Sequence, residues 1–185
     1  MFIINALWLN SYKEYIKQFI TSPREMGSII PSSSSLCNTM LSYIDWDKQS
    51  KFAEIGAGNG VMTKQILQKS SLNTSLDIYE VNNTFITQLQ QIKDNRVVVY
   101  PISAEYLQDE YDVIISGIPF LSLNKKIGMR ILKKANQCLV AKQGVFILFQ
   151  YTQSCEKMFS RYFNFTKQRV YLNFPPAWVY VCYPK

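Results

Sequence analysis

The sequence predicts an α/β domain with a seven-stranded, mostly parallel sheet, helices on both faces and an antiparallel strand pair at its C-terminal end. From residue 51 onward, short apolar runs alternate with segments whose apolar residues recur every three or four positions, an order typical of parallel strands connected by helices. Residues 168–183 alternate β-branched and aromatic residues around Pro175-Pro176, which predicts the terminal pair. A length of 185 residues suits one such domain.

The N-terminal segment is expected to be separate from this domain. Residues 1–22 carry apolar side chains at helical spacing, so we expect an amphipathic helix that covers a pocket or lies on a membrane. Pro23 interrupts the pattern, and residues 23–185 form the expected main domain. A loop over 27–35 ends in serines that suit the N-cap of a helix at about 36–44.

The remaining elements follow the alternation. The strands are expected at residues 51–55, 75–80, 96–100, 111–116 and 144–151, with the terminal pair at 168–173 and 177–183. The helices between them are expected at 61–68, after an Asn82 or Asn83 cap, and at 125–141.

The composition excludes several kinds of chemistry. The chain has no histidine, which rules out a Ser-His-Asp triad, a zinc site with imidazole ligands and a histidine proton shuttle. Its four cysteines, Cys37, Cys138, Cys155 and Cys182, form no C-x-x-C pair, so we expect no disulfide framework and no metal. A secretory signal and an apolar run of the ~20 residues that span a bilayer are both lacking, so a cytoplasmic location is expected.

The charge is divided unevenly along the chain. Residues 1–112 carry 9 basic and 12 acidic side chains, whereas residues 113–185 carry 11 basic side chains and a single acid, Glu156. This asymmetry is consistent with a face that meets phosphate, in nucleic acid or in lipid headgroups, and also with a merely solubilising surface.

The most informative motif is a glycine-rich turn between an expected strand and an expected helix. It reads Glu54-Ile55-Gly56-Ala57-Gly58-Asn59-Gly60, and Glu80 closes the next strand twenty residues later. Glycines let the backbone approach a ligand closely, and an acid at the second strand end can accept hydrogen bonds from ribose hydroxyls. A dinucleotide fingerprint and a S-adenosylmethionine site both contain these parts. An acid directly before the glycines repels a pyrophosphate and complements a sulfonium, so the order E-x-G-x-G-x-G favours S-adenosylmethionine.

With these motifs the sequence resembles the class I S-adenosylmethionine-dependent methyltransferases, which have a Rossmann-like fold. The resemblance implies a cofactor site in which the glycine turn and Glu80 hold the methionine and ribose parts. It implies that residues 103–105 lie at the adenine and that Ser116 begins the loop presenting the methyl acceptor. The implied cofactor-binding residues are Glu54, Gly56, Ala57, Gly58, Gly60, Glu80, Val81, Ser103, Ala104, Glu105 and Ser116.

Three further stretches, at residues 23–33, 116–122 and 173–177, resemble the bacterial phospholipid N-methyltransferases, which methylate phosphatidylethanolamine. This resemblance implies an anionic or zwitterionic phospholipid surface as partner and a peripheral membrane association. The implied substrate-binding residues are Ser32, Ser33, Gly117, Ile118 and Pro119, and basic residues of the following helix, Lys125, Lys126 and Arg130, are candidates for the lipid phosphate.

The rRNA adenine dimethyltransferases are a more distant resemblance. They present N-[IL]-P-[FY] to the base, whereas the corresponding residues here are Gly117-Ile118-Pro119-Phe120. The asparagine that holds the adenine amino group is missing, and their helical RNA-binding domain has no counterpart after the last expected strand. Nucleic acid is therefore the less favoured substrate. A soluble amine as acceptor, and a protein that binds the cofactor without catalysis, also stay open.

Transfer to an amine needs a nitrogen lone pair, and a primary amine with a pKa of ~10.4 is mostly protonated at neutral pH. No histidine is available to remove the proton. Tyr151, at the end of the fifth strand, is the first candidate for a catalytic base, and Tyr15 in the N-terminal helix is the second. A packing role for Tyr151 is an equally simple interpretation.

Overall fold

A computed structural model describes residues 34–173 and 175–185 of the chain. The chain divides into two compact units, Met1–Pro31 and Ser32–Lys185. The first unit, and with it the expected helix at residues 1–22, lies outside the described residues. The described residues all belong to the second unit.

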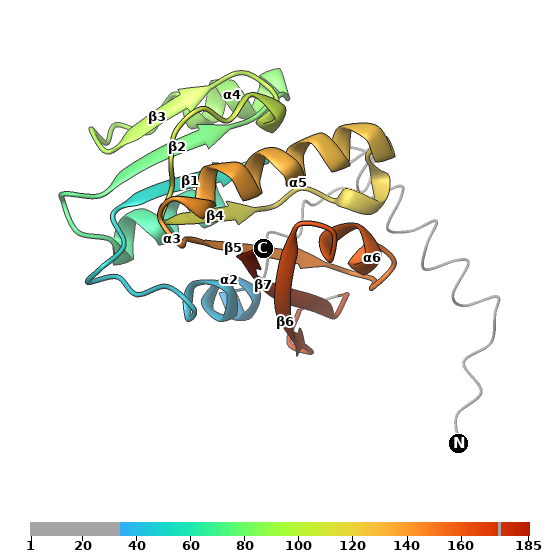
Figure 1. The fold of residues 1–185 in the computed structure, drawn as a ribbon. Helices are drawn as coiled ribbons and strands as arrows, with labels where there is room; N and C mark the ends of the chain where they lie inside the picture. Colours follow the sequence, from blue (N-terminus) through green and yellow to red (C-terminus); the bar gives the residue numbers. More distant parts are fainter. Residues whose placement is uncertain (1–33, 174) are drawn as a thin grey trace. The chain divides into compact units, whose positions relative to one another are not determined.

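A seven-stranded sheet organises this unit, in the order β3-β2-β1-β4-β5-β7-β6 (Figure 1). The first five strands pair in parallel, and β7 pairs antiparallel with both β5 and β6. The predicted fold class is therefore confirmed. The strands are β1 (Lys51–Ile55), β2 (Ser75–Tyr79), β3 (Val97–Tyr100), β4 (Val113–Ser116), β5 (Val145–Gln150), β6 (Phe163–Val170) and β7 (Ala177–Pro184).

Helices cover both faces, and α5 runs across the near face in Figure 1. Phe120, Leu132 and Phe159 belong to a buried hydrophobic cluster between α5 and the near face of the sheet. On the opposite face, Leu36 and Ile66 belong to a second cluster. The helical elements are α2 (Ser34–Leu41), α3 (Val61–Lys69), α4 (Asn83–Leu89), η1 (Ala104–Tyr106), η2 (Phe120–Ser122), α5 (Lys125–Val140) and α6 (Glu156–Phe159).

The split into two clusters follows from strand geometry. Successive side chains of a strand point to opposite faces, so in β1 Phe52 joins the α2 face while Ala53 and Ile55 join the α5 face. All three side chains are fully buried. A strand covered on both faces needs apolar residues at consecutive positions, as at Phe52 and Ala53, and the buried Glu54 is the polar exception in this strand.

Besides the short 3-10 helices η1 and η2, which were not expected, two elements differ from the sequence-based expectation. Strand β6 begins at Phe163, five residues earlier than expected, because it is the edge strand and most of its side chains are exposed. Its polar residues therefore carry no clear period. The four-residue helix α6 was not predicted, since one turn is too short to show a helical period. Among the described residues, no helix is both long and apolar enough to cross a bilayer.

Candidate functional site

The candidate site lies at the carboxyl ends of β1, β2 and β4. The strand order reverses between β1 and β4, because β2 follows on one side of β1 and β5 follows β4 on the other. In open α/β sheets such a reversal leaves a crevice above the strand ends, where ligands bind. The glycine turn after β1 and the loop after β4 meet there.

The glycine turn has the backbone conformation that its sequence predicts. Gly56, Gly58 and Gly60 all have positive φ, between 57° and 78°, a region that residues with a Cβ seldom occupy. A Cβ built on Gly58 would meet no atom within 4 Å. The turn thus presents bare backbone to open space, as close approach by a ligand requires.

Glu80 is fixed beside this turn by the backbone. One carboxylate oxygen accepts a hydrogen bond from the Gly58 N–H at 2.9 Å, and the other accepts from the N–H groups of Val81 and Asn82 at 2.8 and 2.9 Å. Glu80 is buried. A carboxylate offers about four acceptor positions, so three backbone donors leave about one for a ligand hydroxyl.

Glu54 lies deeper than the sequence suggests. Its side chain is 2% exposed and accepts a hydrogen bond at 2.6 Å from the Thr63 hydroxyl of α3. Burial raises the pKa of Glu54, hydrogen bonds from Thr63 lower it and the negative charge of Glu80 raises it, and together these effects bring the pKa from 4.5 to about 8. Glu54 is therefore a buried acid whose protonation responds to a nearby cation.

The residues expected at the adenine form a cluster of their own. Ser103 caps η1 by accepting the Glu105 N–H, and its hydroxyl also bonds the Glu105 carboxylate. The other oxygen of that carboxylate pairs with the Arg130 guanidinium. Arg130, expected to hold a substrate phosphate, is thus already paired with Glu105. Ala104 is buried, and Val81, just after β2, is 66% exposed at the edge of the crevice.

The loop after β4 packs directly on the glycine turn. The Gly117 N–H donates to the Ile55 carbonyl at 3.0 Å, and a Cβ on Gly117 would lie 2.5 Å from the Gly56 carbonyl oxygen. The Ser116 hydroxyl is fully buried and accepts the Ile118 N–H. Ser116 therefore shapes the loop with its side chain, and Gly117 allows a contact that any other residue would prevent.

Basic residues gather beside this loop. Pro119 precedes η2, and α5 begins at Lys125 with Asn124 as its cap. Lys125 and Lys126 line a surface hollow of about 730 Å³ together with Asn124, Met129, Arg130 and Arg161. The three basic residues expected to bind substrate are thereby brought together.

Of the two candidates for a catalytic base, only Tyr151 lies within the described residues. Tyr151 is half-buried just beyond β5, packs edge-on against Phe149 with ring centroids 5.7 Å apart, and belongs to the α2-side cluster. Phe120 of the acceptor loop belongs to the opposite cluster. Tyr15, like Ser32 and Ser33, lies outside the described residues.

Two further residues of the site were not anticipated from the sequence. Thr63 holds Glu54, and the buried Gln150 donates from its amide nitrogen to the Ile118 carbonyl at 2.9 Å. Gln150 is the one polar residue in the otherwise apolar β5 sequence. A polar residue at the end of a buried strand, like a threonine in the first turn after the glycines, is a signal that could have identified them.

The site fits the cofactor expected from the resemblance. The open backbone at Gly58 leaves room for a close approach, the fixed Glu80 keeps an acceptor position for a ribose hydroxyl, and the buried acid Glu54 complements a cation. These three residues would hold the methionine and ribose parts.

Comparisons with known proteins agree. The model of the methyltransferase small domain family matches residues 32–171. Ornithine lipid N-methyltransferase of Singulisphaera acidiphila is 24% identical over 91% of this chain and 93% of its own length. Ribosomal RNA small subunit methyltransferase A of Blochmanniella pennsylvanica is 25% identical, and the matched region covers 87% of this chain and 56% of that protein.

Among solved structures, the N-methyltransferase NodS from Bradyrhizobium japonicum WM9, in complex with S-adenosylhomocysteine, superposes with a TM-score of 0.69 at 11% identity, covering 95% of this chain and 98% of that chain. This likeness concerns the fold. The predicted resemblance to methyltransferases, among them lipid and rRNA enzymes, is confirmed. The chain belongs to the methyltransferase small domain family and is a S-adenosylmethionine-dependent methyltransferase.

Proposed function

We propose that this enzyme methylates an amine nitrogen in the headgroup of a phospholipid, most simply the ethanolamine of phosphatidylethanolamine, at a membrane surface. The observation that carries the proposal is the basic hollow beside the acceptor loop. Lys125 and Lys126 are exposed there and have no carboxylate partner among residues 34–173 and 175–185. Cations in this position complement a phosphate that is covalently linked to the amine. The similarity to an ornithine lipid N-methyltransferase supports a lipid acceptor.

The acceptor loop argues against an adenine substrate. Gly117 stands where rRNA adenine dimethyltransferases carry asparagine, and the contact with Gly56 leaves no room for a side chain there. The amide that would hold an adenine amino group is thus absent.

Held by the glycine turn, Glu54 and Glu80, S-adenosylmethionine would supply an electrophilic methyl group for an amine nitrogen. The protein orients the two reactants and excludes water. The Gln150 amide holds the Ile118 carbonyl and so fixes the loop that presents the acceptor. The ammonium must first lose a proton, and desolvation lowers its pKa.

Tyr151 is our candidate for the group that receives this proton, with Tyr15 as the second. We expect Tyr151→Phe to lower kcat about 100-fold, because the base is lost, and to leave the affinity for S-adenosylhomocysteine unchanged. Turnover assays and calorimetry measure the two effects. Tyr43→Phe is the matched control, since the Tyr43 hydroxyl bonds Gln168 on the edge strand β6. Unchanged turnover in Tyr151→Phe would remove Tyr151 from the mechanism.

The substrate is tested by incubating the full chain with methyl-labelled S-adenosylmethionine and separate acceptors. These are vesicles containing phosphatidylethanolamine, vesicles containing ornithine lipid, ribosomal RNA, and free ethanolamine. We expect label in phosphatidylethanolamine. Label in ribosomal RNA or free ethanolamine alone would refute a lipid acceptor. Label in ornithine lipid alone would keep a lipid acceptor but refute a phospholipid one, because ornithine lipid contains no phosphate.

Membrane association is tested by flotation with vesicles containing anionic lipid. We expect the full chain to float with the vesicles and a variant lacking residues 1–20 to float less. Flotation that is unaffected by the deletion would refute a membrane contact in that segment.

A further inference from the structure

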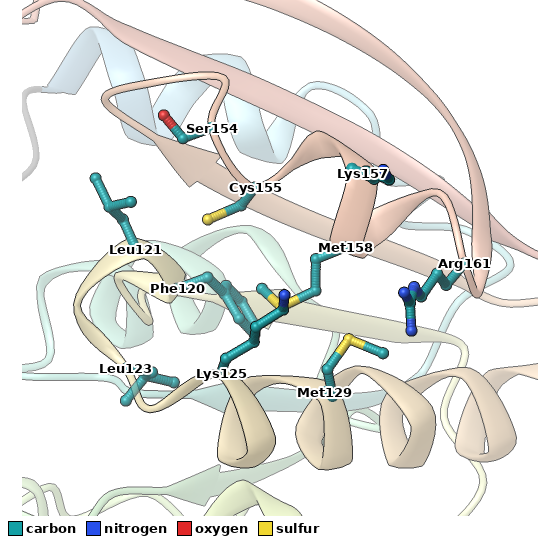
Figure 2. A pocket seen from close by; sticks show the side chains of 10 residues that line it. All are labelled: Phe120, Leu121, Leu123, Lys125, Met129, Ser154, Cys155, Lys157, Met158 and Arg161. Atoms are coloured by element: carbon teal, nitrogen blue, oxygen red, sulfur yellow. The ribbon is translucent and has the colours of Figure 1, made fainter.

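A second cavity lies next to the basic hollow, on the α5 side of the sheet. It has a volume of about 430 Å³ and is enclosed by η2, the first turns of α5, and the α6 segment. Sites for small molecules typically have volumes of ~300–1,000 Å³, so this cavity can hold part of a ligand. Figure 2 shows the side chains that line it.

The floor of the cavity is apolar. Phe120 is fully buried beneath it, and Leu121, Leu123, Met129 and Met158 complete it. In Figure 2, Met129 extends from α5 and Met158 from α6 into the space between the two helices. Methionine side chains are flexible and adapt to irregular apolar shapes. A floor of this kind suits an alkyl chain better than a planar or polar group.

The rim of the cavity is cationic. Lys125, Lys157 and Arg161 line it, and none of the acidic side chains in the described part of the chain does. All three are exposed, and no carboxylate among residues 34–173 and 175–185 pairs with any of them. The nearby Glu156 instead binds Lys167 and the Tyr180 hydroxyl. An apolar floor below unpaired cations complements a molecule with an alkyl chain and an anionic group.

The cavity adjoins the acceptor loop along the chain and shares lining residues with the basic hollow beside that loop. Phe120 directly follows Pro119, and Lys125, Met129 and Arg161 line both this cavity and the basic hollow. A ligand seated here therefore extends from the place where the methyl acceptor is presented.

We propose that this cavity binds a single glycerophospholipid, with the first carbons of one acyl chain on the floor of Phe120, Met129 and Met158 and the phosphate on Lys125, Lys157 and Arg161. The inference rests on the proposed function for the statement that this lipid is the methyl acceptor, but its binding is testable without catalysis.

The binding test uses short-chain lipids below their micelle concentration, with the full chain and isothermal calorimetry. Dihexanoylphosphatidylethanolamine carries chain, phosphate and amine, dihexanoylphosphatidylmethanol lacks the amine, and glycerol 3-phosphate lacks the chains. We expect both dihexanoyl lipids to bind and to compete with each other. We expect glycerol 3-phosphate to bind at least tenfold more weakly, because it cannot use the apolar floor.

Two kinds of variant test the apolar floor and the cationic rim separately. Met129→Trp fills the floor, and Leu121→Glu, at a side chain that is 48% exposed and therefore tolerant of change, places a charge at its edge. Lys157→Glu combined with Arg161→Glu reverses the rim. Lys69→Glu combined with Lys142→Glu is the matched control, because it changes the net charge equally at exposed lysines on other parts of the surface.

We expect either floor variant and the rim variant to weaken binding of dihexanoylphosphatidylmethanol at least tenfold, and the control to change it less than twofold. The affinity for S-adenosylhomocysteine should be unchanged in all of them, which reports an intact fold. Unchanged lipid binding in both floor variants, or equal binding by the rim variant and the control, would overturn the proposal. So would wild-type affinities that are equal for glycerol 3-phosphate and the lipids.

The outcomes separate this inference from the proposed function. Lipid binding that depends on the cavity, together with methyl label found only in RNA or a free amine, would support the lipid site and refute the lipid acceptor. Label in phosphatidylethanolamine vesicles without cavity-dependent lipid binding would support the acceptor and refute the cavity.

Discussion

The two halves of the site are built differently. On the cofactor side, the polar groups are satisfied by the chain itself: three backbone N–H groups hold Glu80, and Thr63 holds Glu54. On the acceptor side, Lys125, Lys126, Lys157 and Arg161 have no carboxylate partner within the described part of the chain.

Because of this difference, we expect the two halves to bind their ligands in different ways. A cofactor site whose groups are already fixed loses little conformational entropy on binding. Exposed cations without internal partners remain hydrated until an anion arrives, and their attraction acts over a distance and depends on salt. The cofactor half is therefore preorganised, whereas the acceptor half is an electrostatic surface.

The largest effect is expected where the two halves touch. Gly117→Asn puts a Cβ 2.5 Å from the Gly56 carbonyl oxygen, so the acceptor loop and the glycine turn must separate by about 1 Å. Misplacement on this scale costs about 100-fold in turnover, and we expect weaker S-adenosylhomocysteine binding as well. Turnover assays and calorimetry measure both.

Gly128→Ala is the control for that substitution, because its added Cβ meets only ordinary contacts at 3.4 Å and beyond. We expect its cofactor affinity to equal that of the unaltered protein. If Gly117→Asn also bound S-adenosylhomocysteine normally, the acceptor loop would not affect the cofactor side through its contact with Gly56.

The next largest effect concerns Glu80. In Glu80→Gln a neutral amide replaces a carboxylate that accepts three backbone hydrogen bonds, and its NH₂ group opposes donors. Hydrogen bonds to charged groups contribute ~1.5–3 kcal/mol, so we expect S-adenosylhomocysteine to bind about 50-fold more weakly in calorimetry. Glu110→Gln, at an exposed acid, is the control. Equal affinities in the two variants would exclude Glu80 from the cofactor site.

The stability of the folded protein is expected to depend on pH through Glu54. Its pKa is about 8 in the folded protein against 4.5 as its ordinary value. Below pH 4.5 the carboxyl is protonated in both states. Between 4.5 and 8 the unfolded chain loses the proton first, so stability falls as pH rises, and above 8 the loss is complete.

Glu54→Gln removes this titration. We therefore expect the Tm of Glu54→Gln, relative to the unaltered protein, to rise by about 10 °C between pH 4.5 and pH 8.5. Thermal unfolding across this range measures the difference. A difference that is constant with pH would mean that the pKa of Glu54 is not raised by burial.

The smallest effects are expected among the acceptor-side cations. Lys126→Ala removes a cation without a carboxylate partner, and we expect a roughly threefold higher KM for lipid with unchanged stability. Arg130→Ala also releases Glu105, and we expect a similar change in KM together with a loss of stability of less than about 1 kcal/mol, because the pair is partly exposed. Vesicle kinetics and denaturant unfolding separate the two quantities. Equal stability in both variants would show that the Glu105–Arg130 pair contributes nothing.

Local patterns in the sequence were enough to predict the alternation of strands and helices along the chain, and the position of the glycine turn. Continuous apolar runs and glycines are local signals, because a strand buried on both faces and a backbone with positive φ restrict residue type at each position. Only the tertiary structure decided which side chains meet. The pairing of Glu105 with Arg130, the hold of Gln150 on Ile118 and the cavity between α5 and α6 join residues far apart in the chain. Such contacts leave no period in the sequence, since they depend on how the strands are ordered in the sheet rather than on neighbouring residues.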